Sequence, residues 1–511
     1  MSTSSRVIKN TTYLYLKMGI TMFVSLYTTR LIMGSLGASD YGIFNVVGGA
    51  IAMLGFLNST LAHATQRFMS YAEGEGKLEK KRCIFNVSIV LHVVIAAVTV
   101  LLLLTAMFPL FNGVFNIESN RVGAARVVYY CLIFSTVLTI INVPYDAVMN
   151  AHENMLYYSI IGIFESLLRL GVAFVCVYTS SDKLVIYGIL MVCIPFITLS
   201  IMKVYCHRHY KECVIAPRKY WDGSLVKQIS IFFGWNFLTA ISSLFSAQGI
   251  GIVLNHFFGT VLNAAQGIAN QVNGALSMFS GNMMKALNPV IVKSAGVGNI
   301  EGMNRAMLAG CKFSAMMTMF FGLPLTLEVN YVLSKWLKDV PTWAATFIVF
   351  QILQSIIVQM ADSAATSVYA KGDIKYYAIW KSIMNALPVL LVWIAFYMGA
   401  GPIWLYIPMI VVYGILGDFV MIYYAHKKCG LNISDYLKSV VLPIVGTFFI
   451  MLLGGGVSVL FLKEGFIRLI ATCTTTTIGF LVSALLFAIS KDEKTQIVLV
   501  VKNLFNRKIK N

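Results

Sequence analysis

Apolar runs of about 20 residues recur along this whole chain, and each is long enough to cross a bilayer as one helix. These runs limit the fold severely, because a backbone in hydrocarbon must satisfy its own hydrogen bonds within helices or a closed barrel. The 511 residues are 58% hydrophobic and only 12% charged, which is too little charge for the surface of a soluble domain of this size. The sequence therefore predicts an all-α, polytopic membrane protein.

Hydropathy predicts about fourteen transmembrane helices. Before the basic stretch HRHYKECVIAPRKYWDG, the expected spans are 12–36, 41–68, 83–108, 125–149, 156–179 and 184–206. After it, they are 228–255, 260–288, 306–331, 343–370, 376–398, 402–426, 437–462 and 466–490.

Lys and Arg collect in short loops that share one side of the membrane. With a cytoplasmic N-terminus, the inner loops include GKLEKKR, HRHYKECVIAPRK and AHKKCG, whereas the outer loops LGASDYG, NHFFGTVLN and MGAGP contain no Lys or Arg. This pattern follows the positive-inside rule, so both termini are expected in the cytoplasm. It also explains the net charge of +18 without a nucleic-acid partner, and we expect none.

The chain contains an internal repeat. A constant shift of 222 places Gly37 on Gly259, and the same shift places SYAEGEGKLE on VKSAGVGNIE. Each matching stretch follows the second helix of a six-helix block, and blocks with an even number of helices are parallel repeats. We expect an N-terminal six-helix bundle over 1–206, a basic cytoplasmic linker over 207–227, a C-terminal six-helix bundle over 228–426, and two additional helices with a basic tail over 427–511. A central cleft between the bundles is the natural product of this arrangement.

A stripe of polar side chains follows the eighth expected span. Its members recur every three or four residues and so share one helix face: Asn263, Gln266, Asn270, Asn273, Ser277 and Ser280. A face of amides cannot point at lipid, where each unpaired group costs several kcal/mol. It faces either a water-filled cavity or another helix through hydrogen bonds, and its length of about five turns favours the cavity.

Cations also lie in the first span. Lys17 shares a polar helix face with Thr21, Ser25 and Thr28, whereas Arg30 lies far around the helix and is placed to reach the outer headgroups. For Lys17, a position in a cavity and a position reaching to the headgroups are equally compatible with the sequence. Lys285 continues the amide-bearing helix and is a further cation expected at the site.

Glu165 and Arg169 lie near the middle of the fifth span, four residues apart, so they are expected to pair on one helix face. Ions at membrane depth are usually functional, although a self-neutralising pair is also compatible with a structural role. Further ions near or inside spans are Asp146, Lys285, Glu328, Asp362, Lys381 and Asp418.

The sequence gives little indication of a catalytic site or a metal site. The nine cysteines show no paired spacing, so we expect free thiols, no metal site and no cofactor. A membrane enzyme such as a glycan polymerase would need a sizeable outer loop, and the outer loops are short. We therefore do not expect an enzyme. A non-transporting scaffold would leave the amide stripe unexplained.

Several stretches resemble the polysaccharide-transport branch of the multidrug/oligosaccharidyl-lipid/polysaccharide (MOP) exporter superfamily, in particular Wzx-type O-antigen flippases. They are LGASDYGIF, TQRFMSYAEGEG, NVPYDAVMNAHENM, GWNFLTAISSLFSAQGIGIVLNHFFGTVLNAAQGIANQV and NPVIVKSAGVGN. The resemblance covers nearly the whole chain. About fourteen helices is the usual number in this branch, whereas the drug exporters of the superfamily typically have about twelve.

The resemblance implies a MATE-like fold and a flippase in the prokaryotic inner membrane. Its substrate would be undecaprenyl-diphosphate-linked oligosaccharide, the repeat unit of O-antigen, capsule or exopolysaccharide, moved by alternating access. It further implies coupling to a proton or sodium gradient and association with membrane lipids and other polysaccharide-assembly proteins.

The resemblance also suggests roles for the residues singled out above. The diphosphate would meet a cationic lumen of Lys17, Arg30, Arg67 and Lys285, and the amide stripe would meet sugar hydroxyls. The residues expected to couple transport to ions are Glu165, Arg169, Asp146 and Asp362. The competing interpretation is a cation-coupled MATE-like exporter of drugs or small metabolites.

Overall fold

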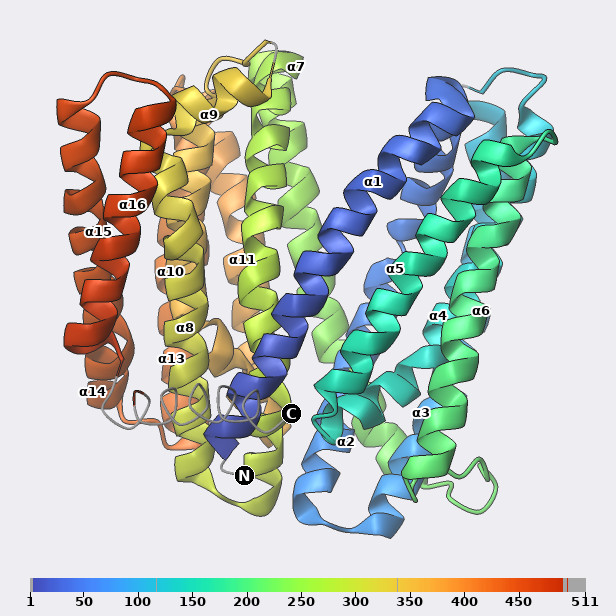
Figure 1. Cartoon of the computed structure of the whole chain (residues 1–511). Helices are drawn as coiled ribbons and strands as arrows, with labels where there is room; N and C mark the ends of the chain where they lie inside the picture. The colour runs from blue at the N-terminus through green and yellow to red at the C-terminus, as the bar shows by residue number, and fades with distance from the viewer. Residues whose placement is uncertain (1–2, 116, 338, 490–493, 495–511) are drawn as a thin grey trace, which may run out of the picture. The chain divides into compact units, whose positions relative to one another are not determined.

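The computed structural model describes residues 3–115, 117–337, 339–489 and 494 of the chain. These residues form helices joined by turns and loops, and this part of the chain contains no strand (Figure 1). The protein is a polytopic, all-α membrane protein, which confirms the prediction made from its apolar runs.

Contacts within the chain define two compact units. The first unit is Asn10–Phe237, and the second continues from Leu238 and includes the start of α1. The division falls inside the long helix α7 (Gly223–Val297). Residues 207–227, where the sequence predicts a linker, therefore lie within the first unit.

The helices of the first unit are long and follow one another closely: α1 (Thr3–Ala52), α2 (Gly55–Glu75), α3 (Leu78–Pro109), η1 (Leu110–Val114), α4 (Val122–Ala151), α5 (Met155–Tyr178) and α6 (Lys183–His209). α4 packs against α2, α3 and α6 and forms the centre of this unit.

The second unit begins within α7 and alternates long helices with short helical pieces: α8 (Ile300–Leu327), α9 (Val329–Trp336), α10 (Ala344–Lys371), α11 (Lys375–Tyr397), η2 (Pro402–Leu405), α12 (Tyr406–Pro408), η3 (Met409–Leu416), α13 (Gly417–Cys429), α14 (Ile433–Tyr436), η4 (Leu437–Val441), α15 (Leu442–Phe461), α16 (Phe466–Ser483) and η5 (Ala484–Ala488). Its centre is α10, which packs against α8 and α13.

Glycine breaks two helices at equivalent positions of the repeat. Gly37 in α1 has φ 79° and ψ 169°, and Gly259 in α7 has φ 77° and ψ −169°. This backbone region is almost closed to residues with a Cβ atom, so only glycine enters it without strain. At each glycine one helix ends and another begins in a new direction.

A second pair of glycines repeats the match. Gly76 and Gly298 both have positive φ, 71° and 80°, and each is followed by a helix that begins two residues later, at Leu78 and Ile300. Both pairs are separated by the shift of 222 found in the sequence. The internal repeat is thus confirmed at the level of backbone conformation within each unit.

The described residues include 11 helices long and apolar enough to span a membrane, or up to 12 when the bent pair Ser39–Ala52 and Gly55–Glu75 counts as one span. α7 enters this count once, although its 75 residues would extend about 110 Å as a straight helix. The hydrocarbon core is only about 30 Å thick, so α7 supplies two spans separated at Gly259. The part of α1 before Gly37 is not among the 11, since Lys17, Arg30 and several hydroxyl residues lower its hydropathy.

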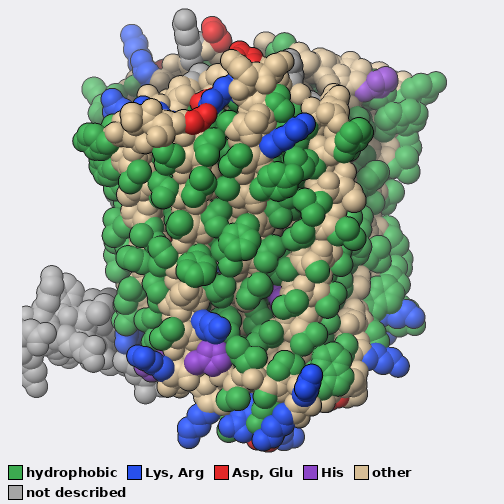
Figure 2. Space-filling view, turned by 90° about the vertical axis from the view of Figure 1, so that its right-hand side faces the viewer, with side chains coloured by type: hydrophobic (Ala, Val, Ile, Leu, Met, Phe, Trp, Pro, Cys, Tyr) green, Lys and Arg blue, Asp and Glu red, His purple; other side chains and the backbone are tan. Residues whose placement is uncertain are grey.

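One face of the molecule has the distribution of apolar and charged side chains expected for a membrane protein. On the face shown in Figure 2, apolar side chains cover a broad middle band, and the largest group of Lys and Arg lies at its lower end. The apolar band matches a lipid-facing surface, because charged side chains are expensive within hydrocarbon.

The loop between α6 and α7 is fastened to the first unit. The Asn86 amide of α3 donates to the Val214 carbonyl at 2.8 Å, and its Oδ1 accepts from the Ala216 N–H, also at 2.8 Å. Arg82 donates to the Lys211 carbonyl at 3.2 Å. This basic loop is therefore an ordered part of the end of the first unit.

The last two long helices pack closely through small residues. A Cβ atom at Gly454 would lie 3.2 Å from the Thr475 carbonyl oxygen, and one at Gly455 would lie 2.7 Å from the Thr476 side chain. Gly454 and Gly455 thus lie at the close contact between the two helices, whereas an added Cβ at Gly456 would meet open space. Small residues let helix backbones approach closely. In a membrane, helix association depends on such van der Waals contacts, because the hydrophobic effect does not drive helices together in lipid.

A buried ion pair fastens α16 to the end of α8. Glu328 is 1% exposed and accepts from Arg468 Nη2 at 2.9 Å, from Arg468 Nε at 3.0 Å and from the Thr472 hydroxyl at 2.8 Å. The guanidinium and hydroxyl together replace the water that a carboxylate loses on burial. The two C-terminal helices are thus joined to α8 by a specific charged contact as well as by apolar packing.

Gly37→Ala and Gly259→Ala are each expected to reduce the free energy of unfolding by about 1–3 kcal/mol, because alanine strains the positive-φ backbone. Thermal unfolding of the purified protein in detergent measures this as a lower melting temperature. Gly34→Ala and Gly267→Ala are matched controls in the same helices, where an added Cβ meets open space. Equal effects of the two test variants and the two control variants would contradict the requirement for glycine at these helix breaks.

Glu328→Gln is expected to reduce the free energy of unfolding by roughly 3 kcal/mol, because it removes the buried counter-charge of Arg468. Glu464→Gln is the control, since Glu464 lies 3.9 Å from Arg468 and is 53% exposed. Proteolysis of the detergent-solubilised protein reports release of α15 and α16. If both variants digest like the wild type, the ion pair does not hold these helices.

Candidate functional site

The amide stripe of α7 lines a cavity of about 530 Å³ inside the second unit. Gln266, Asn270, Asn273, Ser277 and Ser280 all reach its wall, in the segment of α7 after Gly259. Asn263, the first member of the predicted stripe, is not at the wall, and its Oδ1 lies near Gly251 of the preceding segment. The volume falls in the range of small-molecule sites, about 300–1,000 Å³.

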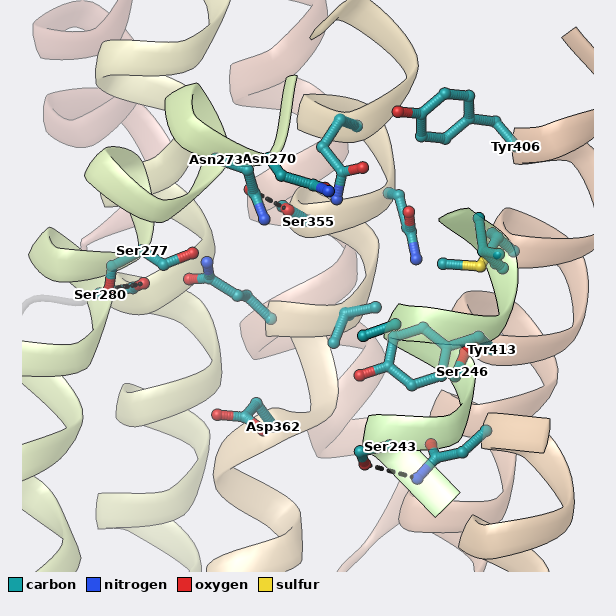
Figure 3. Close-up of a pocket in the computed structure, with 18 of the residues that line it drawn as sticks. Ser243, Ser246, Asn270, Asn273, Ser277, Ser280, Ser355, Asp362, Tyr406 and Tyr413 are labelled. Carbon is teal, nitrogen blue, oxygen red and sulfur yellow. Dashed lines mark hydrogen bonds between the residues drawn. The ribbon is translucent and has the colours of Figure 1, made fainter. Parts of the chain in front are cut away.

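The other walls come from both segments of α7 and from α8, α10, α11, η2, α12 and η3 (Figure 3). Most lining residues carry an amide or a hydroxyl, including Ser243, Ser246, Ser314, Gln351, Gln354, Ser355, Gln359, Asn385, Tyr406 and Tyr413. Apolar contributions come from Ala247, Ile250, Met284, Val358, Leu405 and Met409. The cavity therefore presents a polar lining interrupted by small apolar patches.

Hydrogen bonds hold parts of this lining in place. The Ser355 hydroxyl of α10 donates to Asn273 Oδ1 at 2.5 Å, and these two side chains point toward each other in Figure 3. The Asn385 amide of α11 donates to the hydroxyls of Ser242 and Ser243 at 3.0 and 2.8 Å. The walls from α7, α10 and α11 are thus cross-linked by polar contacts.

Five buried polar atoms of the lining have no hydrogen-bond partner within the described part of the chain. They are Ser314 Oγ, Gln354 Oε1, Gln359 Oε1, Asn385 Oδ1 and Tyr406 Oη. Buried polar groups are almost always hydrogen-bonded, and an unmet one costs about 1–3 kcal/mol. The residues around the cavity therefore keep unmet hydrogen-bonding capacity next to this space.

The charge of this cavity is low. Asp362 of α10 is the only Asp, Glu, Lys or Arg among the described residues that line it. Behind the wall, Lys381 of α11 interacts electrostatically with Asp362 and with Asp418 of α13, and its ammonium lies 4.5 Å from the centre of the Tyr413 ring. The fold thus gathers three ions that the sequence presents singly.

The predicted cations do not line this cavity. Lys17, Arg30 and Arg67 belong to the first unit, and Lys285 follows Met284, the last α7 residue at the wall. Arg30 is exposed on α1. Arg67 packs over the rings of Phe68, Tyr71 and Phe232 at 4.4–5.4 Å.

Lys17 lies in a polar cluster of the first unit. Its ammonium is 4.3 Å from the centre of the Tyr158 ring, and its aliphatic end covers Gly162, where an added Cβ would lie 2.2 Å from Lys17 Cε. Tyr158 also interacts electrostatically with Asp146 and Glu165. The helices α1, α4 and α5 therefore bring Lys17 and two carboxylates to one tyrosine.

The expected pairing of Glu165 and Arg169 is confirmed, with Arg169 Nη2 2.8 Å from Glu165 Oε1. Their side chains are 38% and 47% exposed. Asp146 accepts a hydrogen bond from Asn142 at 3.3 Å. Three of the four residues predicted to couple ions thus lie on neighbouring helices of the first unit, and Asp362 lies in the second.

Sequence reasoning missed the second polar stripe of the cavity, on α10. Gln351, Gln354, Ser355, Gln359 and Asp362 recur at helical spacing and share one face. The same criterion that found the α7 stripe would have found them. Asn385 and Tyr406, by contrast, are isolated polar residues in apolar surroundings, and only the fold brings them to the cavity.

Neither a protein-family model nor a curated protein sequence matches this chain. Solved transporter structures do match it at 13% identity. A MATE protein in the bent conformation has TM-score 0.73 over 84% of this chain and 96% of its own. An outward-facing multidrug resistance MATE transporter of the MOP superfamily gives 0.70 over 84% and 96%.

A MOP-superfamily transporter from Pyrococcus furiosus, described as having a binding pocket of reverse polarity that suggests a different function, gives TM-score 0.69 at 13% identity over 86% of this chain and 97% of its own. The protein therefore has the fold of the MATE transporters of the MOP superfamily. This confirms the MATE-like fold that the sequence resemblance implied. At this identity the likeness concerns the fold alone, so the polysaccharide-transport branch stays a prediction.

Proposed function

We propose that this protein is a flippase that moves undecaprenyl-diphosphate-linked oligosaccharide across the prokaryotic inner membrane by alternating access. The observation that carries this proposal is the polar lining of the cavity of the second unit, whose residues include five buried polar atoms without a hydrogen-bond partner in the described part of the chain. The transporter fold supports membrane transport, and the lining supports the class of substrate.

Sugar hydroxyls match this lining chemically. A hydroxyl both donates and accepts, so it can serve the amide oxygens of Gln354, Gln359 and Asn385 as well as the hydroxyls of Ser314 and Tyr406. The small apolar patches and the Tyr rings complement the C–H faces of sugar rings. An apolar drug would leave the five atoms unpaired, and that would oppose its binding.

The lipid diphosphate requires cations, and the first unit offers Lys17. Its ammonium is positioned by Tyr158 and Gly162, and an ammonium is a suitable point charge for a phosphate oxygen. We assign Lys17 to the diphosphate, with Arg30, Arg67 and Lys285 as further candidate contacts. Lys17 belongs to the first unit, and the cavity assigned to the sugar belongs to the second.

We assign the coupling of transport to an ion gradient to the carboxylates and to the arginine paired with one of them. Asp362 faces the cavity and interacts with Lys381, so a proton or sodium ion that binds there would change the charge of the sugar-facing wall. Asp146, Glu165 and Arg169 form the corresponding group of the first unit. The proposed partners are the lipid-linked sugar, membrane lipids and other polysaccharide-assembly proteins.

The second candidate is a cation-coupled MATE-like exporter of drugs or small metabolites. The observation that favours it is the charge of the cavity, where Asp362 would attract an organic cation. A multidrug MATE transporter also shares the fold. The two candidates differ in substrate, so one assay with both substrates separates them.

Gln354→Leu and Gln359→Leu are expected to reduce the initial flipping rate about tenfold each, because a lost hydrogen bond of about 1.4 kcal/mol changes a rate or affinity by that factor. The assay uses purified protein in vesicles with fluorescent undecaprenyl diphosphate bearing a short oligosaccharide. Parallel vesicles contain the same lipid without sugar or a cationic dye. Gln271→Leu is the control, since Gln271 lies on α7 but does not line the cavity.

The proposal requires that the wild type flips the glycolipid and that the two cavity variants lose this activity while remaining folded. Glycolipid flipping that is unaffected by both variants would remove the cavity from the mechanism. Dye transport without glycolipid flipping would establish the second candidate instead.

Gly162→Ala is expected to displace Lys17 without removing its charge, because the new methyl group occupies the position of Lys17 Cε. The flexible lysine can move, so the fold is expected to persist while the glycolipid flipping rate falls several-fold. Gly171→Ala on the same helix meets open space and should flip at the wild-type rate. Wild-type flipping by Gly162→Ala would contradict the role of Lys17.

A further inference from the structure

A cluster of metal-binding residue types lies at one end of the first unit, outside the site described above. Glu73 lies in the last turn of α2, His152 directly follows α4, and Glu212 lies in the loop after α6. One ligand atom from each residue can be chosen so that all three lie within 4.8 Å of one another. The residues are far apart in the sequence, so only the fold brings them together.

His152 is positioned between the two carboxylates. Its Nε2 is 2.5 Å from Glu212 Oε1, and its Nδ1 is 3.5 Å from Glu73 Oε1. The Tyr210 ring stacks on the imidazole with 4.3 Å between ring centres and 13° between planes. The ring is therefore oriented by contacts on both edges and on one face.

The two carboxylates of this cluster need positive partners. A neutral imidazole carries one N–H and can donate to only one of the two carboxylates. Lys81 binds Glu73 Oε2 at 2.7 Å, which offsets one negative charge. Glu212 is 2% exposed, and a buried carboxylate needs a close positive partner.

We propose that Glu73, His152 and Glu212 form a binding site for a divalent transition metal of the zinc class. One imidazole nitrogen and two carboxylate oxygens are common ligands for such ions, at about 2.0–2.2 Å from the metal. Ligand atoms in a tetrahedral site lie about 3.3 Å apart, so small side-chain movements bring the three into place. Lys81 retains the second oxygen of Glu73, and water completes the coordination.

The metal would join three separate segments of the first unit. It would link the end of α2, the end of α4 and the α6–α7 loop, which Asn86 already fastens from the other side. Since the metal binds the folded arrangement, it would stabilise that end of the unit. This site is independent of the proposed transport of lipid-linked sugars.

The test is titration of tag-free, metal-free protein in detergent, in one experiment with Zn²⁺ and in a separate experiment with Co²⁺. We expect one ion per chain, a Co²⁺ absorption spectrum typical of nitrogen and oxygen ligands, and a higher melting temperature in Zn²⁺. His152→Ala and Glu73→Gln should each weaken binding at least about tenfold, since even outer-shell changes reduce metal affinity by about 10–100-fold.

His209→Ala is the matched control, because His209 lies near the same end and is exposed, stacked on Tyr205. It should bind the metal like the wild type. Absence of stoichiometric binding would overturn the proposal, as would binding that survives both His152→Ala and Glu73→Gln. If His152→Ala does not fold, Glu73→Gln and Glu212→Gln decide the result.

Discussion

Hydrocarbon offers no hydrogen-bond partners, and this constraint organises the whole molecule. Backbone groups are satisfied inside helices, and the two unusual glycine conformations, at Gly37 and Gly259, mark where the chain leaves one helix and enters another. Charged side chains find partners, as Glu165 does in Arg169 and Glu328 does in Arg468.

The same constraint makes the cavity of the second unit informative. Amides and hydroxyls from α7, α8, α10, α11 and α12 surround one cavity, and five buried polar atoms of these residues have no hydrogen-bond partner in the described part of the chain. A membrane protein that keeps such atoms unpaired must supply them with water or ligand. The polarity of the cavity is therefore the strongest indication of what the protein binds.

Most of the fold could be predicted from the sequence. Apolar length identified the spans, and the glycine pairs of the repeat identified equivalent breaks and helix starts. Hydropathy works well here because lipid-facing helices carry a strong apolar signal of their own. The short helix α9 and the residues that hold the α6–α7 loop were not predicted, because they depend on contacts between distant parts of the chain.

The site was only partly predictable. The stripe from Gln266 to Ser280 was recognised because its spacing is a property of one helix, and the similar stripe of α10 carries the same signal. The grouping of Lys381 with Asp362 and Asp418 is different, because it joins three helices and has no signature in any one of them. The predicted cations do not line this cavity, so charge alone was a weaker guide than helical spacing.

The most direct test of the account is an experimental structure of the protein with undecaprenyl-diphosphate-linked oligosaccharide bound. Sugar rings are expected within hydrogen-bonding distance of Gln354, Gln359 and Asn385, in the cavity that the α7 amides line. A structure in which the sugar binds elsewhere, while those side chains pair only with protein, would contradict it.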